Sequence, residues 1–430
     1  MKKNYLKRSY YRLDSILETI KIIFLGLFIK YPKIVSHKFF LYKTPPKSVI
    51  KFNFFGILFT NIWYIFIYFS KFKKLPFIIE DKINDKFSSS DFFNSGEITN
   101  PSFKVDKSTE INLEFYKYIN KSYQMSIEDD NLKYRNSEWW TECIQDFKKK
   151  IFDDNGNIII NNLENIFQLD FKAILFELSS PIKQNKNKIS NFLSSLRIIN
   201  QYHLLSDIIM DGVLRTISEP KIGNNKCVIY RGQRLSERLI RHGYYVSQII
   251  KNTKFLNDPN QVFLDLGGGF GSLSRLLITI NKTSKCILIE QPEVCLIAAY
   301  YLKKNFPKKK LLTYSDYRNL SDKSKFFENK DFDILILPSW CFSEIPNDYI
   351  DLSINTTSLG EVSKDYGKYF LDNIERTTKN YFYSNNKVNS VENIWDGFGH
   401  NQFDFKKNWF PIIYNFSYTW HLEFLGKKIN

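Results

Sequence analysis

Short apolar runs alternate with helical repeats over the second half of the chain. The runs at Val262–Leu266, Cys286–Ile289 and Phe332–Leu337 are almost wholly apolar, as buried strands are. Similar runs follow at Asp351–Asn355 and Tyr381–Ser384, and between the runs apolar residues recur at helical spacing. Strands that alternate with helices predict a doubly wound α/β sheet, which binds its ligands at the carboxyl ends of the strands.

The two ends of this pattern differ from its middle. Near the end of the chain Tyr418, Trp420, Leu422 and Phe424 are separated by single polar residues, which predicts a half-exposed antiparallel strand. Residues 111–225 carry mostly helical periodicity, so a mostly helical region precedes the sheet. The helical runs are Leu113–Met125, Ser137–Ile151, Leu163–Leu178 and Ile189–Ile217.

Composition marks the domain boundaries. Residues 80–110 are dominated by Ser, Asn, Asp and Lys and lose their periodicity, which predicts a polar linker. The predicted domains are a basic, aromatic-rich helical segment (1–79), the linker (80–110), a helical cap or substrate-side region (111–225) and the α/β domain (226–430).

The charge of the chain is concentrated at one end. Of the formal net charge of +16, residues 1–79 carry +13, from 15 basic residues and two acids, which leaves +3 for the rest. Binding to nucleic-acid phosphates depends on clustered Lys and Arg, so the nearly neutral α/β domain predicts no nucleic-acid partner. The basic segment also contains Phe52–Ser70, an apolar stretch without a charged residue and with Lys clusters on both sides.

A helix lying on an anionic membrane surface fits both Lys clusters, because a single span would place one of them on the wrong side. A buried helix pair and a true span are the alternatives. Five scattered cysteines without a CxxC pair argue against a disulfide framework or zinc module and favour a reducing compartment. No apolar core with a cleavage site follows the basic start promptly, so no cleaved signal peptide is expected. We expect a cytoplasmic protein, at the inner face of the cytoplasmic membrane if residues 1–79 contact lipid.

The clearest chemical signal is the sequence Gln261–Gly271 (QVFLDLGGGFG), in which a buried strand is followed by a glycine-rich turn and then an amphipathic helix. Glycines allow the tight turn and the close approach of a ligand, and the amides at the helix N-terminus point toward it. A second strand ends at Glu290, where a carboxylate can accept both ribose hydroxyls of a nucleoside.

Two nucleoside ligands fit this layout. The third glycine of a dinucleotide fingerprint would fall at Ser272, so an NAD-dependent enzyme is the weaker alternative. Instead, Asp265 precedes three glycines at alternate positions, Gly267, Gly269 and Gly271. This pattern resembles motif I of class I S-adenosylmethionine-dependent methyltransferases.

The resemblance becomes narrower over residues 231–385. The blocks YRGQRLSERLIRHGYY, IEQPEV, LPSWCFSEIP, INTTSLGEV and YFYSNN, together with motif I, are similar to a bacterial family of sugar O-methyltransferases. SEWW at Ser137–Trp140 fits the same pattern, whereas the first 110 residues lie outside it. The resemblance implies a Rossmann-like class I methyltransferase sheet, S-adenosylmethionine as cofactor and a sugar or glycan-precursor hydroxyl as acceptor.

Site residues follow from these motifs. Ser339 and Trp340 are placed to cover adenine, although Trp340 also fits a core position; Asp316 could serve the same edge. Asn355 and Ser358 occupy the place where amino-methylating DNA enzymes carry their Asn/Asp-Pro-Pro-aromatic block, and we assign them to the substrate. The predicted cofactor-binding residues are Asp265, Gly267, Gly268, Gly269, Gly271, Glu290, Gln291, Ser339 and Trp340.

A base that removes the hydroxyl proton would assist methyl transfer. Glu361 follows the fourth strand, where the alternative is charge placement at a helix N-terminus, and His400 lies in a glycine-bearing loop after the fifth strand. His242 lies on an apolar helical face, where a packed core histidine is the alternative. His37, His203 and His421 have no supporting context. No metal-ligand spacing occurs, so no metal site is predicted. A membrane-surface glycan-assembly scaffold with a degenerate site remains the non-enzymatic alternative.

Overall fold

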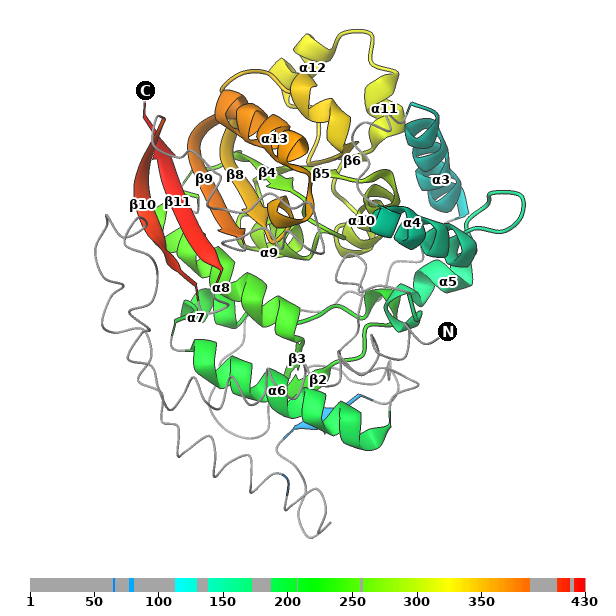
Figure 1. Ribbon diagram of the computed structural model, residues 1–430, viewed down its shortest axis with the longest axis vertical. Coiled ribbons are helices and arrows are strands. Elements are labelled where there is room, and N and C mark those ends of the chain that lie inside the picture. The colour runs from blue at the N-terminus through cyan, green and yellow to red at the C-terminus, as the bar shows by residue number, and fades with distance from the viewer. Residues whose placement is uncertain are drawn as a thin grey trace.

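The computed structural model describes residues 77–80, 113–129, 138–171, 187–206, 208–255, 258–386, 408–417 and 421–429, together with Ile65. These ranges contain the sheet and most of the helical region (Figure 1). The rest of the apolar stretch 52–70 and the candidate His400 lie outside them. Within the described ranges, no helix has the length and hydropathy that crossing a membrane requires.

An eight-stranded sheet forms the centre of the α/β domain, in the order β10-β11-β9-β8-β4-β5-β7-β6. The strands β9, β8, β4, β5, β7 and β6 pair with one another in parallel, whereas β11 is antiparallel to both β9 and β10. This confirms the predicted fold class, a Rossmann-like sheet with an antiparallel C-terminal strand. The strands are β4 (Val262–Leu266), β5 (Lys285–Glu290), β6 (Leu311–Leu312), β7 (Ile334–Pro338), β8 (Ile350–Thr356), β9 (Thr378–Asn386), β10 (Trp409–Phe416) and β11 (Leu422–Lys428).

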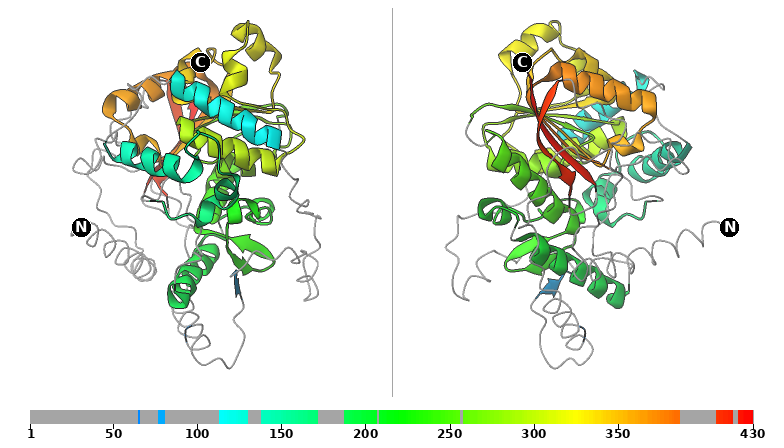
Figure 2. Two further views of the ribbon diagram at one scale, coloured as in Figure 1. Left: turned by 90° about the vertical axis from the view of Figure 1, so that its right-hand side faces the viewer. Right: turned by 60° about the vertical axis from the view of Figure 1, so that its left-hand side comes forward.

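Helices cover both faces of this sheet (Figure 2). One face packs against α8 (Glu237–Asn252), α9 (Ser272–Ile280) and α10 (Pro292–Asn305). The other packs against α11 (Tyr314–Arg318), α12 (Lys323–Asn329) and α13 (Lys364–Thr377), with the 3-10 turns η6 (Ser339–Glu344) and η7 (Leu359–Glu361) nearby. Successive strand residues alternate between the two cores, because side chains along a strand point to opposite faces: Phe263 faces the first core, and Val262 and Leu264 face the second.

The helical region does not have a core of its own. Its elements are α3 (Leu113–Glu128), α4 (Glu138–Ile151), α5 (Ile160–Glu164), η3 (Ile166–Gln168), α6 (Lys188–Ser206), α7 (Asp211–Leu214) and η5 (Ile222–Asn224). Tyr116 and Ile119 of α3 belong to the same hydrophobic cluster as Leu296 and Tyr300 of α10 and as Phe263 of the sheet. The region is therefore packed onto the first face of the sheet rather than attached as a separate cap.

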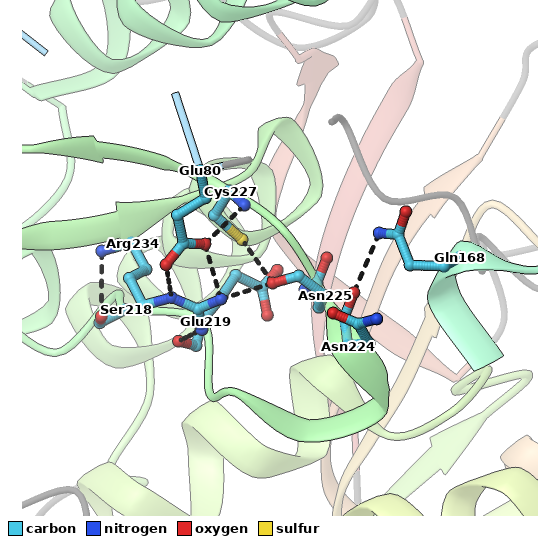
Figure 3. A network of polar contacts seen from close by, with 8 residues as sticks. All are labelled: Glu80, Gln168, Ser218, Glu219, Asn224, Asn225, Cys227 and Arg234. Carbon is cyan, nitrogen blue, oxygen red and sulfur yellow. Dashed lines mark hydrogen bonds and ion pairs between the residues drawn. The ribbon is translucent and has the colours of Figure 1, made fainter. Parts of the chain in front are cut away.

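A small antiparallel sheet joins β1 (Ile78–Ile79) to two strands that lie far from it in sequence and are separated by only two residues, β2 (Val228–Tyr230) and β3 (Gln233–Leu235). The carboxylate of Glu80 accepts two hydrogen bonds of 2.9 Å from the Arg234 guanidinium and one of 2.9 Å from the Cys227 backbone amide (Figure 3). Both residues of this ion pair are largely buried. The boundaries predicted at 79/80 and at 225/226 thus fall within one structural unit.

Three sequence predictions are wrong in their detail. The helix predicted over Leu163–Leu178 is interrupted after Glu164, because Asn165 takes the C-cap position and is held by a 2.8 Å hydrogen bond from Asn224. Residues 172–178 of this prediction lie outside the described residues. The helix predicted over Ile189–Ile217 is two helices, since α6 ends at Ser206 and α7 begins at Asp211.

The third wrong prediction concerns β11, which is antiparallel but not half-exposed. It is buried from Leu422 to Gly426 because it lies between β9 and β10. Its polar residue Glu423 points inward, where it accepts hydrogen bonds from the hydroxyl groups of Tyr244 (2.7 Å) and Tyr383 (2.6 Å).

Candidate functional site

The glycine turn, residues Gly267–Gly271, connects β4 to α9. Gly267, Gly269 and Gly271 have φ angles of 68°, 56° and 89°, in the left-handed region that favours glycine. A Cβ atom on Gly267 would also lie 2.1 Å from the Ser358 hydroxyl oxygen. The turn therefore needs glycine for backbone shape and for space, and it brings unpaired amides of α9 to the carboxyl end of the sheet.

Asp265, on β4, contacts both the glycine turn and α9. Its side chain is 1% exposed, and its Oδ2 accepts a 2.6 Å hydrogen bond from the Ser274 hydroxyl on α9. Its Oδ1 has no hydrogen-bond partner among the described residues. A Cβ atom on Gly268 would lie 2.6 Å from the Asp265 carboxyl carbon, so the two residues are in close contact. Burial raises the pKa of Asp265 to about 6.

Glu290 ends β5 and faces the same turn. Its Oε1 accepts the Gly269 backbone amide at 3.0 Å, and its Oε2 accepts the Gln291 backbone amide at 2.9 Å. The side chain is half-buried. Because each carboxylate oxygen retains a second lone pair, both oxygens can accept hydrogen bonds from a ligand with two adjacent hydroxyl groups.

Ser339 and Trp340 follow β7, the neighbour of β5 in the sheet, where Pro338 is in register with Glu290. Ser339 is 2% exposed, and its hydroxyl has no hydrogen-bond partner among the described residues. Trp340 is half-buried against the second core and meets Tyr314 edge to face, with ring centroids 6.2 Å apart. The position of Trp340 is therefore compatible with both predictions, contact with adenine and a place in the hydrophobic core.

Asp316 does not face this edge. Its side chain closes the capping box of α11 and accepts a hydrogen bond from Tyr118 of α3. Its role in the structure is to anchor α3 against α11.

Asn355 and Ser358 brace the loop after β8 against β4. The Asn355 Nδ2 donates to the Leu266 carbonyl at 2.8 Å and to the Ser358 hydroxyl at 2.6 Å. Asn355 is fully buried, whereas Ser358 is half-buried and touches Gly267. Of the two residues assigned to the substrate, only Ser358 retains surface that a ligand can reach.

His242 lies on α8 beside the start of α9, with its Nδ1 3.2 Å from the Ser272 hydroxyl. It is 7% exposed. Burial, together with the positive charges of Arg241, Arg238 and Arg275, lowers its pKa well below the usual value. The imidazole is therefore neutral at pH 7 and enclosed next to the glycine turn, as a packed core histidine would be.

The other two candidate bases are less defined. Glu361 ends η7, in the loop after β8, and its side chain lies outside the described residues. His400 lies outside them altogether. Both remain predictions. No group of three or more metal-binding side chains occurs within the described ranges.

A polar cluster at the end of β9 was not predicted. The Oδ1 of Asn385, which is fully buried, accepts a 3.2 Å hydrogen bond from Tyr245 of α8 and lies 3.2 Å from Nδ1 of His421. The three residues are distant in sequence, and His421 reaches Asn385 only because β11 pairs with β9, with Leu422 opposite Asn386. No local sequence signal marks this meeting, since it depends on strand pairing.

The chain matches no protein-family profile and no curated protein. Among solved structures, it aligns with the magnesium protoporphyrin IX methyltransferase of Synechocystis PCC 6803 with bound SAH, at 10% identity and a TM-score of 0.32, over 44% of this chain and 82% of that one. It also aligns with a SAM-dependent methyltransferase of Aquifex aeolicus, at 14% identity and a TM-score of 0.27, over 42% and 88%.

These alignments cover less than half of the chain, and the fold assignment rests on the strand order.

Proposed function

We propose that this protein is an S-adenosylmethionine-dependent O-methyltransferase that acts on a hydroxyl of a sugar or glycan precursor. The main support for this cofactor is the position of Glu290. Its two carboxylate oxygens are held by the Gly269 and Gln291 amides, directly beside the glycine turn. This geometry suits the ribose of a nucleoside at the carboxyl ends of the strands.

The residues present fit S-adenosylmethionine. Glu290 would hold the ribose, Gln291, Ser339 and Trp340 would lie on the adenine side, and the glycine turn above Asp265 would approach the amino-acid part. When bound, the cofactor supplies an electrophilic methyl group on a sulfonium. Among the described residues the Ser339 hydroxyl has no hydrogen-bond partner, so it could bond an adenine nitrogen in the proposed site.

The chain must hold the acceptor oxygen in line with the methyl carbon, and positioning supplies much of such a rate. Ser358, half-buried against Gly267, is the residue we propose for binding the acceptor, with Asn355 fixing its hydroxyl. Glu361 and His400 stay proposed as bases. The neutral, enclosed His242 is better placed to hold Ser272, the first residue of α9, than to exchange protons with solvent.

The sugar acceptor rests on the sequence blocks IEQPEV and INTTSLGEV and on the nearly neutral charge outside residues 1–79, which disfavours nucleic acid. Calorimetric titration with S-adenosylhomocysteine tests the cofactor, and labelled methyl transfer to cell-surface glycan precursors tests the acceptor. Absence of product binding would end the proposal. A fluorescence titration with nicotinamide dinucleotide separates the NAD alternative, and product binding without any methyl transfer would favour the scaffold.

We also propose that residues 1–79 contact anionic lipid at the inner face of the cytoplasmic membrane, on account of their +13 charge and apolar stretch. The test is co-sedimentation with phosphatidylglycerol vesicles and with phosphatidylcholine vesicles. A variant lacking residues 1–76 should lose binding to the anionic vesicles while keeping β1 and Glu80. Unchanged binding would refute membrane contact through this segment.

A further inference from the structure

Three side chains from α8, β9 and the start of β11 meet at the carboxyl end of the sheet: Tyr245, Asn385 and His421. Resting on the proposed function, we propose that His421 accepts the proton of the acceptor hydroxyl and that Asn385 holds its imidazole in the required tautomer. Asn385 is a positioning residue, and Tyr245 in turn orients Asn385.

The hydrogen bonds around Asn385 define this tautomer. The Tyr245 hydroxyl donates to Oδ1 of Asn385 at 3.2 Å. The Nδ1 of His421 lies 3.2 Å from the same oxygen. With the amide in this orientation, a hydrogen bond between the two atoms requires the proton on Nδ1, because a carboxamide oxygen only accepts, and we infer that Nε2 is the nitrogen that takes up the acceptor proton. A base whose other nitrogen is fixed by a buried acceptor is the arrangement that general-base catalysis uses.

Position in the fold supports the same role. His421 directly precedes β11, which runs antiparallel to β9, so it lies at the edge of the sheet that holds the glycine turn and Glu290. Two hydrogen bonds from Ser417, at 2.9 Å and 3.2 Å, hold the His421 carbonyl. The Asn385 carbonyl accepts the Thr357 amide at 2.9 Å, and Thr357 adjoins Ser358, which touches Gly267.

The three residues of the cluster differ in burial. Tyr245 and Asn385 are fully buried, whereas His421 is half-buried and can be reached by a ligand. The Nδ2 of Asn385 has no hydrogen-bond partner among the described residues.

Two ionisable groups near His421 in the described part of the chain already have hydrogen-bond partners. On β11, Glu423 is occupied by the hydroxyl groups of Tyr244 and Tyr383. On α8, His242 is enclosed next to Ser272. Glu423 and His242 are both buried, whereas His421 is half-buried.

The step is balanced. As the acceptor oxygen bonds to the methyl carbon, the carbon–sulfur bond breaks and its electron pair remains on sulfur, which becomes a neutral thioether. The O–H proton passes to Nε2 of His421. The imidazolium then returns the proton to water, and no further reactant is needed.

The experiment has an acceptor-independent arm and a kinetic arm. Long-range ¹⁵N–¹H NMR of the full-length protein loaded with S-adenosylhomocysteine should show His421 as the Nδ1–H tautomer. The Asn385→Ala variant should lose this preference. A wild-type His421 in the Nε2–H tautomer would overturn the proposal, whether or not the protein is a methyltransferase.

The kinetic arm measures methyl transfer from labelled S-adenosylmethionine to a panel of nucleotide-activated sugars across pH 5–9. His421→Gln should lower kcat about 100-fold or more, with the affinity for S-adenosylhomocysteine changed less than about twofold. Asn385→Asp, of equal size, should move the acidic limb of the kcat profile to higher pH, because a carboxylate stabilises the imidazolium.

The matched control is His203→Gln, because His203 bonds the Tyr230 hydroxyl at 3.0 Å in the helical region. It should retain the wild-type rate. If His421→Gln keeps the wild-type kcat and pH profile, His421 is not the base although the methyltransferase function stands. If the wild type binds S-adenosylhomocysteine but methylates nothing in the panel or in glycan extracts, the proposed function fails instead.

Discussion

The Glu290 carboxylate lies 3.0 Å from the backbone amide of Gly269, so the end of β5 is bonded directly to the glycine turn after β4. A second bond, from the Gln291 amide, fixes the other oxygen. The same two oxygens that would bind a ribose therefore also shape the turn that would receive the rest of the cofactor. Cofactor affinity and turn geometry are coupled through one side chain.

Replacing Glu290 by Gln should weaken S-adenosylhomocysteine binding about 10–100-fold, because the amide nitrogen cannot accept hydrogen bonds and the charge assistance is lost. Calorimetric titration measures the effect. Glu328→Gln, at an exposed position of α12, is the matched control. Equal affinities of the Glu290 variant and the wild type would remove Glu290 from the cofactor site.

Alanine substitutions at three glycines distinguish backbone strain at a positive φ from a steric clash of the new Cβ atom. Gly267→Ala combines a φ of 68° with a Cβ atom 2.1 Å from the Ser358 hydroxyl, and it should cost about 2–5 kcal/mol of unfolding free energy. Gly232→Ala has a φ of 75° but no atom within 4 Å of the new Cβ, and about 1–2 kcal/mol is expected. Gly212→Ala has neither problem. Urea unfolding should rank the three in this order, and a Gly267 variant no worse than Gly232→Ala would contradict the contact with Ser358.

The raised pKa of Asp265 makes stability depend on pH. The folded carboxyl has a pKa of about 6 against an ordinary value of 3.8, so the folded state binds more protons between these values. Its contribution to stability is therefore lost as pH rises from about 4 to 6, by up to about 3 kcal/mol.

Asp265→Asn removes that penalty while keeping an acceptor for Ser274. Relative to the wild type, this variant should gain stability in urea unfolding as pH rises from 4 to 7, with little difference at pH 4. Asp372→Asn, at an exposed position of α13, should show no such trend. A pH-independent difference for the Asp265 variant would show that its carboxyl titrates normally.

The ion pair between Glu80 and Arg234 should be costly to break. Glu80→Gln leaves the largely buried guanidinium without its charged partner, and a loss of about 3–5 kcal/mol in unfolding free energy is expected. Asp331→Asn breaks the exposed pair with Lys310 and should cost less than about 1 kcal/mol.

Deleting residues 1–80 should destabilise the fold more than deleting 1–76. Similar losses in the two deletions would mean that Glu80 does not anchor the small sheet.

The sequence predicts the centre of this fold well because strands buried on both faces appear as apolar runs. Glycines and carboxylates directly after such runs then place the glycine turn and Glu290 at the same edge of the sheet. Structural features that depend on residues distant in sequence cannot be predicted from local sequence patterns. The end of α5 depends on Asn224, and the cluster of Asn385 with His421 depends on how β11 pairs with β9.

Polarity misleads for a related reason. Glu423 occupies a position that an alternating pattern assigns to solvent, yet two tyrosine hydroxyl groups make it a buried residue. Both tyrosines are distant in sequence, one on α8 and one on β9. This carboxylate can be buried because the folded chain brings both hydroxyl groups within hydrogen-bond distance of it.

The single hydrophobic cluster that runs from α3 through α10 into the sheet limits how such a protein can be altered. Residues 111–225 cannot be exchanged as a block without disturbing the face of α10 on which α3 packs. For the proposed methyltransferase, a change of acceptor would therefore come from single substitutions at the rim of the sheet. For the same reason, we expect limited proteolysis between these regions to yield no stable catalytic fragment.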